Sequence, residues 1–174
     1  IGSRGEGEGQ FQGITGISMD DVHIAVCDFN ADSVLLFDKA SGAFVRRFGS
    51  YGSGQGQFNA PYGVCLDGDN VYVCESENKR VQVLTKEGVF VRLIGDGDLG
   101  DPMDVAVDEQ HVFVADNGSK CIKVFTKEDG VFVREVSYMA TDGMHIFQPY
   151  FLAVCEGLLY ATDTANDCVA VFEG

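Results

Sequence analysis

The chain has 174 residues, of which 45% are hydrophobic, and its 12 Lys and Arg against 27 Asp and Glu give a formal net charge of −15. This length predicts a single domain with a sizeable core, and the hydrophobic content excludes a disordered acidic tail. A surface this negative repels phosphate backbones, so nucleic acid is an unlikely partner. No apolar run approaches the roughly 18 residues of a membrane-spanning helix, so a membrane is excluded.

The chain begins with "IGSRGEGEGQ", which has no Met, no apolar core and no basic amphipathic character. These features exclude a signal peptide and a transit peptide. We expect this start to be a cut end, so that any targeting segment would be missing.

The same pattern then recurs four times. A shift of 47 residues places "GQFQGITGISMDDVHIAVCDFNADSVLLFD" beneath "GQFNAPYGVCLDGDNVYVCESENKRVQVLT" without a gap. A shift of 41 adds "DPMDVAVDEQHVFVADNGSKCIKVFT", and a further 47 adds "QPYFLAVCEGLLYATDTANDCVAVFE". We expect one domain, 1–174, with repeats at approximately 1–49, 50–95, 96–137 and 138–174.

Each copy contains short runs rich in valine and aromatic residues, bounded by Gly, Asp and Asn, which is typical of strands and hairpins. The first strands are predicted near 15–19, 62–66, 103–107 and 150–154. The glycine-rich link "GSYGSGQGQF" would cross from one sheet to the next and need not pack, except through a wedge residue. Phe11 and Phe58 are the predicted wedges between neighbouring sheets.

Repeated four-stranded meanders of this length predict an all-β fold, a β-propeller built of four-stranded antiparallel blades. The alternation of large apolar residues on both sides of each strand fits blades that are covered on both faces. A β-sandwich of unrelated strands is the main alternative, but it does not explain why the self-match has no gap.

The unit "GQFxxPxGVxxDxxxVYVxxxxNxRVQVFxxxGxFVRxxG" resembles the NHL repeat, and the second copy matches it nearly throughout. The first copy departs from the pattern with Ile14 or Thr15 in place of Pro, and the fourth with Phe151 in place of Gly. The resemblance implies a propeller that usually closes with about six blades. It leaves function open, because the family spans scaffolds, ubiquitin-ligase substrate modules, RNA binders, receptor sensors and a few lyases.

Four blades of normal wedge angle would leave an open arc with two apolar flanks, which must be covered. We expect a segment of a larger propeller, or closure with a second copy, or closure by four splayed blades alone. The expected flanks are Val22, Ile24 and Val34 at one end, and Leu158, Tyr160 and Val169 at the other.

The six cysteines are predicted to be unpaired and mostly buried. The expected antiparallel register sets Cys65 opposite Val73, so that Cys65 and Cys74 do not form a bridge. No close-spaced pair such as CxxC indicates a metal site. Free thiols favour a reducing compartment, and we expect an intracellular, cytoplasmic protein.

No pattern indicates catalysis. His23 and His111 share one turn position, and His145 has no partner in the sequence pattern. The loop "DGDLGD" brings Asp96, Asp98 and Asp101 together as a weak metal candidate, but the EF-hand order is absent. We therefore expect no cofactor, no metal and no enzymatic activity.

A binding surface is the remaining expectation. Exposed aromatic residues, Met and Arg are typical of interface hot spots. We expect a scaffold for a protein or peptide ligand; the alternatives are an RNA-binding NHL module of a ubiquitin-ligase-like protein and a metal-dependent NHL-type lyase. The candidate face comprises Phe29, Tyr51, Tyr62, Lys79, Arg80, Met103, Asn117, Lys120, Tyr150 and Phe151.

Overall fold

The computed structural model describes residues 1–138 and 147–173, and within them the chain is built almost entirely of β-strands. The helical structure in this part is one 3-10 turn, Phe29–Ala31. The all-β expectation is confirmed. None of the described residues form a helix that is long and apolar enough to cross a membrane.

Four antiparallel sheets follow one another along the chain, and each is a meander of consecutive strands. Blade 1 comprises β3 (Ile14–Met19), β4 (His23–Asp28), β5 (Ser33–Asp38) and β6 (Phe44–Phe48). Blade 2 comprises β7 (Pro61–Asp67), β8 (Asn70–Glu75), β9 (Arg80–Thr85) and β10 (Phe90–Ile94). Blade 3 comprises β11 (Pro102–Val107), β12 (His111–Asp116), β13 (Cys121–Thr126) and β14 (Phe132–Val136). Blade 4 comprises β15 (Pro149–Cys155), β16 (Leu158–Asp163) and β17 (Cys168–Glu173).

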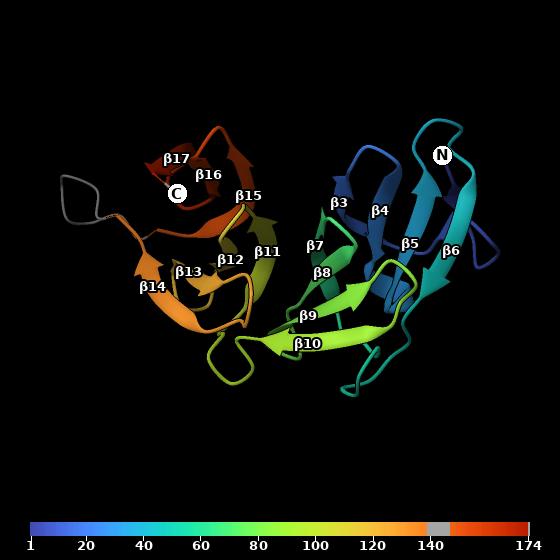
Figure 1. Ribbon diagram of the computed structural model, residues 1–174, viewed down its shortest axis with the longest axis horizontal. Helices are drawn as coiled ribbons and strands as arrows, with labels where there is room; N and C mark the ends of the chain where they lie inside the picture. The colour runs from blue at the N-terminus through green and yellow to red at the C-terminus, as the bar shows by residue number, and fades with distance from the viewer. Residues whose placement is uncertain (139–146, 174) are drawn as a thin grey trace.

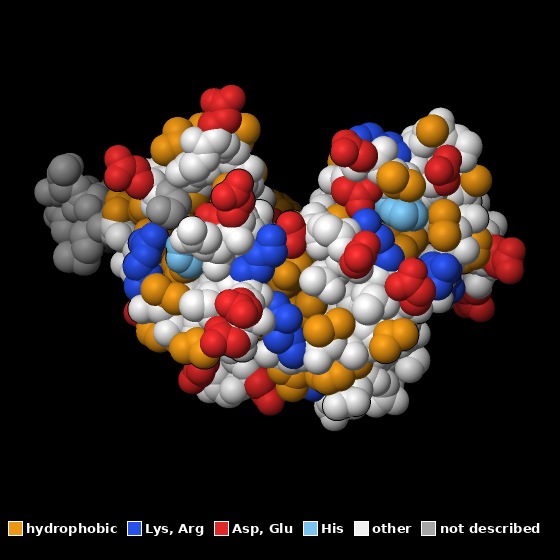
Figure 2. Space-filling view, in the orientation of Figure 1, with side chains coloured by type: hydrophobic (Ala, Val, Ile, Leu, Met, Phe, Trp, Pro, Cys, Tyr) orange, Lys and Arg blue, Asp and Glu red, His pale blue; other side chains and the backbone are white. Residues whose placement is uncertain are grey.

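The blades form an arc with their first strands innermost (Figure 1). Neighbouring first strands are joined by hydrogen bonds: the Thr15 hydroxyl donates to the Pro61 carbonyl at 3.1 Å, and the Leu152 N–H donates to Asp104 at 2.9 Å. Blades 1 and 4 form the two ends of the arc, and Figure 2 shows the molecule hollowed between them. The structure therefore has the open arc that the sequence predicts.

The first strands lie where the sequence predicts them, each beginning one residue earlier than expected. The predicted register of blade 2 is wrong by one residue, since Cys65 lies opposite Tyr72 and not Val73. The reason is the turn: Asp67 pairs with Asn70, so only two residues connect the strands. A two-residue turn sets the register of the whole hairpin.

One wedge residue precedes the first strand of each blade. Phe58 is fully buried between Val34 and Leu36 of blade 1 and Val71 of blade 2. Phe11 packs in the same way on blade 1, where its ring centroid lies 5.6 Å from that of Phe37. The two predicted wedges are confirmed, and the structure adds two more. The wedge residues are Phe11, Phe58, Leu99 and Phe147.

A buried carboxylate at the end of each second strand holds the backbone that follows the wedge. Asp28 accepts hydrogen bonds from the N–H groups of Gln12 at 2.9 Å and Gly13 at 2.7 Å. The same arrangement recurs in every blade; the four clasp carboxylates are Asp28, Glu75, Asp116 and Asp163. Each wedge is thus fastened to the blade that comes after it.

The glycine-rich link before blade 2 is packed more firmly than the sequence suggests. Arg80 is buried and pairs with Glu75 at 2.8 Å, and its guanidinium also donates to the backbone carbonyls of Ser53 and Gly54. The link is therefore held by a buried charged side chain, in addition to its wedge.

One expected flank residue is wrongly placed. Val34 is fully buried and faces blade 2, whereas Val22 is exposed and Ile24 is half-buried on the outer side of blade 1. Val34 and Val169 occupy the same repeat position, so both face the following blade. Only Val169 has no following blade to cover it, and it is exposed.

All six cysteines are free, as predicted. Cys27, Cys74 and Cys121 are buried and Cys65 is half-buried. The expectation of burial fails for the two cysteines of blade 4, Cys155 and Cys168, which are exposed. They are exposed because they lie on the end blade of the arc.

Candidate binding surface

The first strands of the blades surround a central channel, and four aromatic rings line up at one end of it. Phe29 stacks edge-to-face on Tyr62 with centroids 6.1 Å apart, Tyr62 on Tyr150 at 5.6 Å, and Tyr150 on Phe151 at 5.0 Å. Phe29 and Phe151 are exposed, and the two tyrosines are half-buried. We call Phe29, Tyr62, Tyr150 and Phe151 the aromatic row. It brings together residues of blades 1, 2 and 4 that are far apart in the sequence.

The backbone explains why these side chains meet. Tyr62 and Tyr150 each follow a proline that begins a first strand, and both strands have a register irregularity directly after that proline. Such a bulge re-aims a side chain at the edge of a sheet. Phe29 begins the 3-10 turn after the second strand of blade 1. Because paired strands run antiparallel, the start of one lies beside the end of the next, so all three positions share one edge of the arc.

A hydrogen bond fixes the centre of the row. The hydroxyl oxygens of Tyr62 and Tyr150 are 2.6 Å apart. Burial, together with this hydrogen bond, raises the pKa of Tyr150 to about 12. The Tyr150 hydroxyl therefore remains protonated at neutral pH.

The structure separates the other members of the predicted face. Lys79 and Lys120 are exposed at matching positions in the loops after β8 and β12. Asn117 lies nearby and donates to the Pro149 carbonyl at 3.4 Å. Tyr51 is 71% exposed, but it lies in the link before blade 2, where it pairs with Phe58.

Two members of the predicted face are not on the surface. Arg80 is buried by its pairing with Glu75, and Met103 is buried at the start of β11. The alternation of β9 could not reveal the burial of Arg80, because its partners belong to the glycine-rich link. The clasp carboxylates were also missed, although the repeat shifts align them at one position in all four copies.

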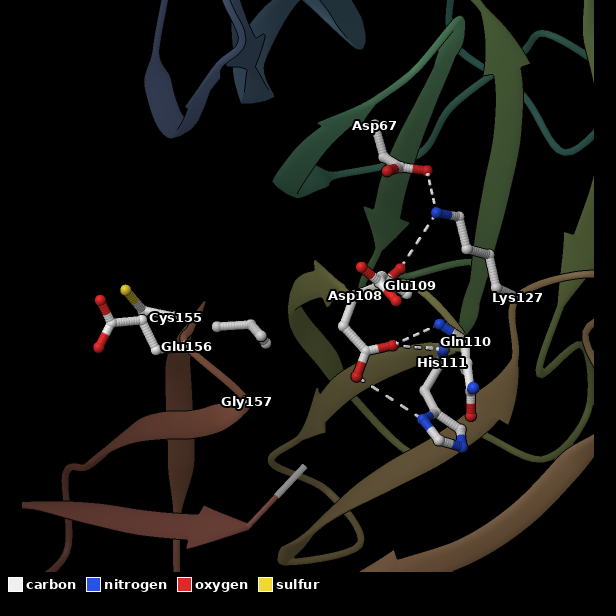
Figure 3. A pocket seen from close by; sticks show the side chains of 10 residues that line it. Asp67, Asp108, Glu109, Gln110, His111, Lys127, Cys155, Glu156 and Gly157 are labelled. Atoms are coloured by element: carbon white, nitrogen blue, oxygen red, sulfur yellow. Dashed lines mark hydrogen bonds and ion pairs between the residues drawn. The ribbon is translucent and has the colours of Figure 1, made fainter.

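A hollow with a volume of about 590 Å³ lies at the opposite edge of the arc. Its walls come from the turns of blades 2, 3 and 4 (Figure 3). Lys127 lies between two acidic residues there: its Nζ is 2.8 Å from the Asp67 carboxylate and donates to the Asp108 carbonyl at 3.0 Å. His111 Nδ1 lies 3.6 Å from Asp108. These charged groups are already paired with one another.

The Lys127–Asp67 pair belongs to a repeated contact between neighbouring blades. Lys86 of blade 2 forms the corresponding pair with Asp20 of blade 1, at 2.6 Å. Burial opposes ionisation of Asp20, but Lys86 and two backbone N–H groups lower its pKa to about 2. The charges around the large hollow thus hold blades together, and the aromatic row is the better candidate for ligand binding.

The predicted metal candidate does not assemble. Asp96 and Asp98 are exposed, while the Asp101 N–H donates to the clasp carboxylate Asp116 at 2.8 Å. Across residues 1–138 and 147–173, no group of three His, Cys, Asp or Glu side chains could hold a metal ion. His145 lies outside the described residues.

The arrangement of strands defines the class of protein: consecutive antiparallel meanders with their first strands around a common axis form a β-propeller. The family model of the NHL repeat matches residues 58–84 and 99–125, which contain the wedge and first three strands of blades 2 and 3. The chain is therefore a β-propeller in which blades 2 and 3 match the NHL repeat, as its sequence indicates. No curated protein sequence matches it.

Solved structures share this fold at low identity. The chain is similar to Kuenenia stuttgartiensis hydrazine synthase (TM-score 0.72, 17% identity, 94% of this chain and 46% of that one). It is also similar to a chain of the nidogen/laminin complex (TM-score 0.75, 15% identity, 94% and 60%). The computationally designed Ika4 protein matches over 98% of this chain and 99% of its own (TM-score 0.66, 14% identity). The chain thus spans about half of the first structure and 60% of the second.

Proposed function

We propose that the chain is a non-catalytic binding module that holds a protein or peptide ligand on the aromatic row. The observation that supports this most is the row itself, in which four partly exposed rings meet at the channel mouth. Aromatic side chains supply large contact areas with little loss of rotamer freedom, and they dominate interface hot spots. A short extended segment with apolar side chains is the ligand that such a row would favour.

The charge distribution favours a protein ligand over RNA. The chain has a net charge of −15, and of the basic residues expected on this face only Lys79 and Lys120 are exposed. Arg80 is engaged with Glu75 in the interior. An RNA-binding surface needs several accessible cations, since phosphate contacts supply most of the affinity.

A binding role without catalysis agrees with the surroundings of the described histidines. His23 and His111 each face an aspartate of their own turn, at 3.9 and 3.6 Å. A fold of this kind also occurs in the nidogen/laminin complex, which is an assembly of proteins.

The test is to select peptides from a random library on the immobilised chain and to measure their affinity by calorimetry. We expect Tyr62→Ala and Phe29→Ala each to weaken binding of the selected peptide at least about tenfold, as for interface hot spots. Tyr51→Ala is the matched control, because it removes an exposed tyrosine outside the row. Equal affinity for the wild type and both row variants would refute the proposal. Binding of a single-stranded RNA with a steep salt dependence would favour the alternative.

A further inference from the structure

The two ends of the arc expose side chains whose counterparts at the other blade interfaces are buried or half-buried. On blade 4, Val169 and Val171 are 58% and 53% exposed. Together with Tyr160 and Thr162 they form what we call the trailing face. On blade 1, Ile17 and Met19 are 63% and 56% exposed, and with Ile24 and the wedge Phe11 they form the leading face.

The repeats show what normally covers each face. At the interface of blades 2 and 3, the residues equivalent to the trailing face pack against those equivalent to the leading face and against a wedge. Val81 and Val83 represent the trailing side there, Val105 the leading side and Leu99 the wedge, and all four are buried. The leading face thus has the surface and the wedge that the trailing face lacks.

We propose that a second copy of this chain covers these surfaces, with the leading face of each copy packed on the trailing face of the other. Two equivalent seams then close the two arcs into one ring with two-fold symmetry. The inference does not rest on the proposed ligand, because the aromatic row and the seams share only Phe151. The blade interfaces within the chain serve as the template for both seams.

The strand edges support the same pairing. In blade 1, Phe48 at the end of the fourth strand lies opposite Val34. By the repeat shift, Ile1 corresponds to Phe48 and Val169 to Val34. Ile1 of one copy is therefore placed opposite Val169 of the second copy, along the outer edge of β17. A hollow of about 370 Å³ lies at each of these places, one beside Ile1 and one beside Val169.

Charge complementarity supports the seam as well. Lys86 and Lys127 each reach the preceding blade and pair with an aspartate there. Lys39 has the same repeat position on blade 1 as these two lysines. The position of their aspartate partners, Asp20 and Asp67, is occupied on blade 4 by Cys155, next to the exposed Glu156. Lys39 of one copy would thus approach Glu156 of the second copy.

Phe151 makes the proposed seam between two copies differ from the interfaces between blades within one chain. Gly16 and Gly63 let the first strands of adjacent blades approach closely, since a Cβ at Gly16 would lie 2.4 Å from the Tyr62 carbonyl oxygen. Phe151 has this repeat position in blade 4 and is exposed. The seam is therefore wider at the channel than an internal interface, and Phe151 fills it against the exposed Ile14 of the second copy.

Sedimentation equilibrium from low to high micromolar concentration tests this pairing. About 0.15 M salt limits the repulsion between two acidic chains, because the screening length is then about 8 Å. We expect the wild type to have twice the mass of one chain, and Val169→Glu and Ile17→Glu each to have the mass of one. Val89→Glu is the matched control, since Val89 is 61% exposed but lies in the turn before β10, and it should remain dimeric.

A mixture of the two variants distinguishes this pairing from a symmetric contact between like faces. Val169→Glu retains an intact leading face and Ile17→Glu an intact trailing face, so together they should form a dimer with one seam. A wild-type monomer would overturn the proposal, as would a larger assembly, a dimeric Val169→Glu, or a mixture that stays monomeric. Circular dichroism should show that both variants keep the wild-type fold, because each changes an exposed side chain.

Discussion

The interface between blades 2 and 3 and the outer face of blade 4 use the same repeat positions in opposite states. Val83 is fully buried, whereas its counterpart Val171 is 53% exposed. The residue is the same, and so is its place in the third strand of a blade. The difference shows that burial in this molecule depends on the place of a blade in the array and not on the side chain itself.

Substitution of a wedge residue has the largest expected effect and tests whether burial depends on the place of a blade in the array. Phe58 is packed between two blades, so Phe58→Ala should lower the free energy of unfolding by about 3–5 kcal/mol. Phe11 contacts blade 1 alone, and Phe11→Ala should cost about half as much. Urea denaturation at a concentration where the chain is monomeric measures both. Equal losses would mean that the second blade contributes nothing to the wedge.

The second prediction concerns Asp104, which bonds to the Leu152 N–H between the inner strands of blades 3 and 4. Burial raises the pKa of this carboxyl from 3.8 to about 7. The folded chain therefore holds the proton more tightly than the unfolded chain. The stabilising contribution is complete below about pH 4 and is lost as the pH rises through 7, by at most about 4 kcal/mol.

Asp104→Asn should remove this loss, so that the variant gains stability relative to the wild type between pH 4 and pH 8. Thermal unfolding across this range checks the effect. The control is Asp69→Asn in the exposed turn after β7, which should follow the wild type. A variant whose pH dependence equals that of the wild type would show that folding does not raise the pKa of Asp104.

The buried pair of blade 2 gives the third prediction. Glu75→Gln leaves the Arg80 guanidinium buried without its counter-charge, which should cost about 3 kcal/mol. Glu77→Gln makes the same chemical change at an exposed position two residues later and should change stability by less than about 0.5 kcal/mol. Urea denaturation compares the two. Similar values for both variants would mean that the pair is dispensable for the link.

The smallest expected effect concerns the two equivalent valines, Val83 at an internal interface and Val171 on the trailing face. Val83→Ala should cost about 2 kcal/mol, because it removes fully buried methyl groups. Val171→Ala should be nearly neutral in the monomer, since most of its side chain contacts solvent. Thermal unfolding at low concentration measures both variants. A similar cost at both positions would contradict the exposed state of the trailing face.

Repeats explain why the fold was predictable from sequence. The gapless shift of 47 residues carried the first three strands of blade 1 onto blade 2, and the two predicted wedges, Phe11 and Phe58, are the large apolar residues at the ends of the glycine-rich links. The register of Cys65 was missed because it depends on a two-residue turn. The face of Val34 was missed because each blade is apolar on both sides, so periodicity cannot say which neighbour a side chain meets.

The binding surface was predictable only in part. Tyr62 and Tyr150 follow equivalent prolines, but their contact spans the channel and depends on the curvature of the arc. Arg80 was expected on the surface because charged residues rarely lie inside. Its partners are a carboxylate and backbone carbonyls of the link, and no local pattern identifies them in advance.

The fastening of each wedge to the blade that follows it gives the molecule a direction. The structural module is a wedge together with its blade, so every array of such modules begins with a sheet that carries a wedge on its outer face and finishes with a sheet that does not. Removal or duplication of a module alters the span of the array but leaves both of its ends chemically unchanged. The number of modules can therefore change during evolution while the leading and trailing faces keep the surfaces by which they pack together.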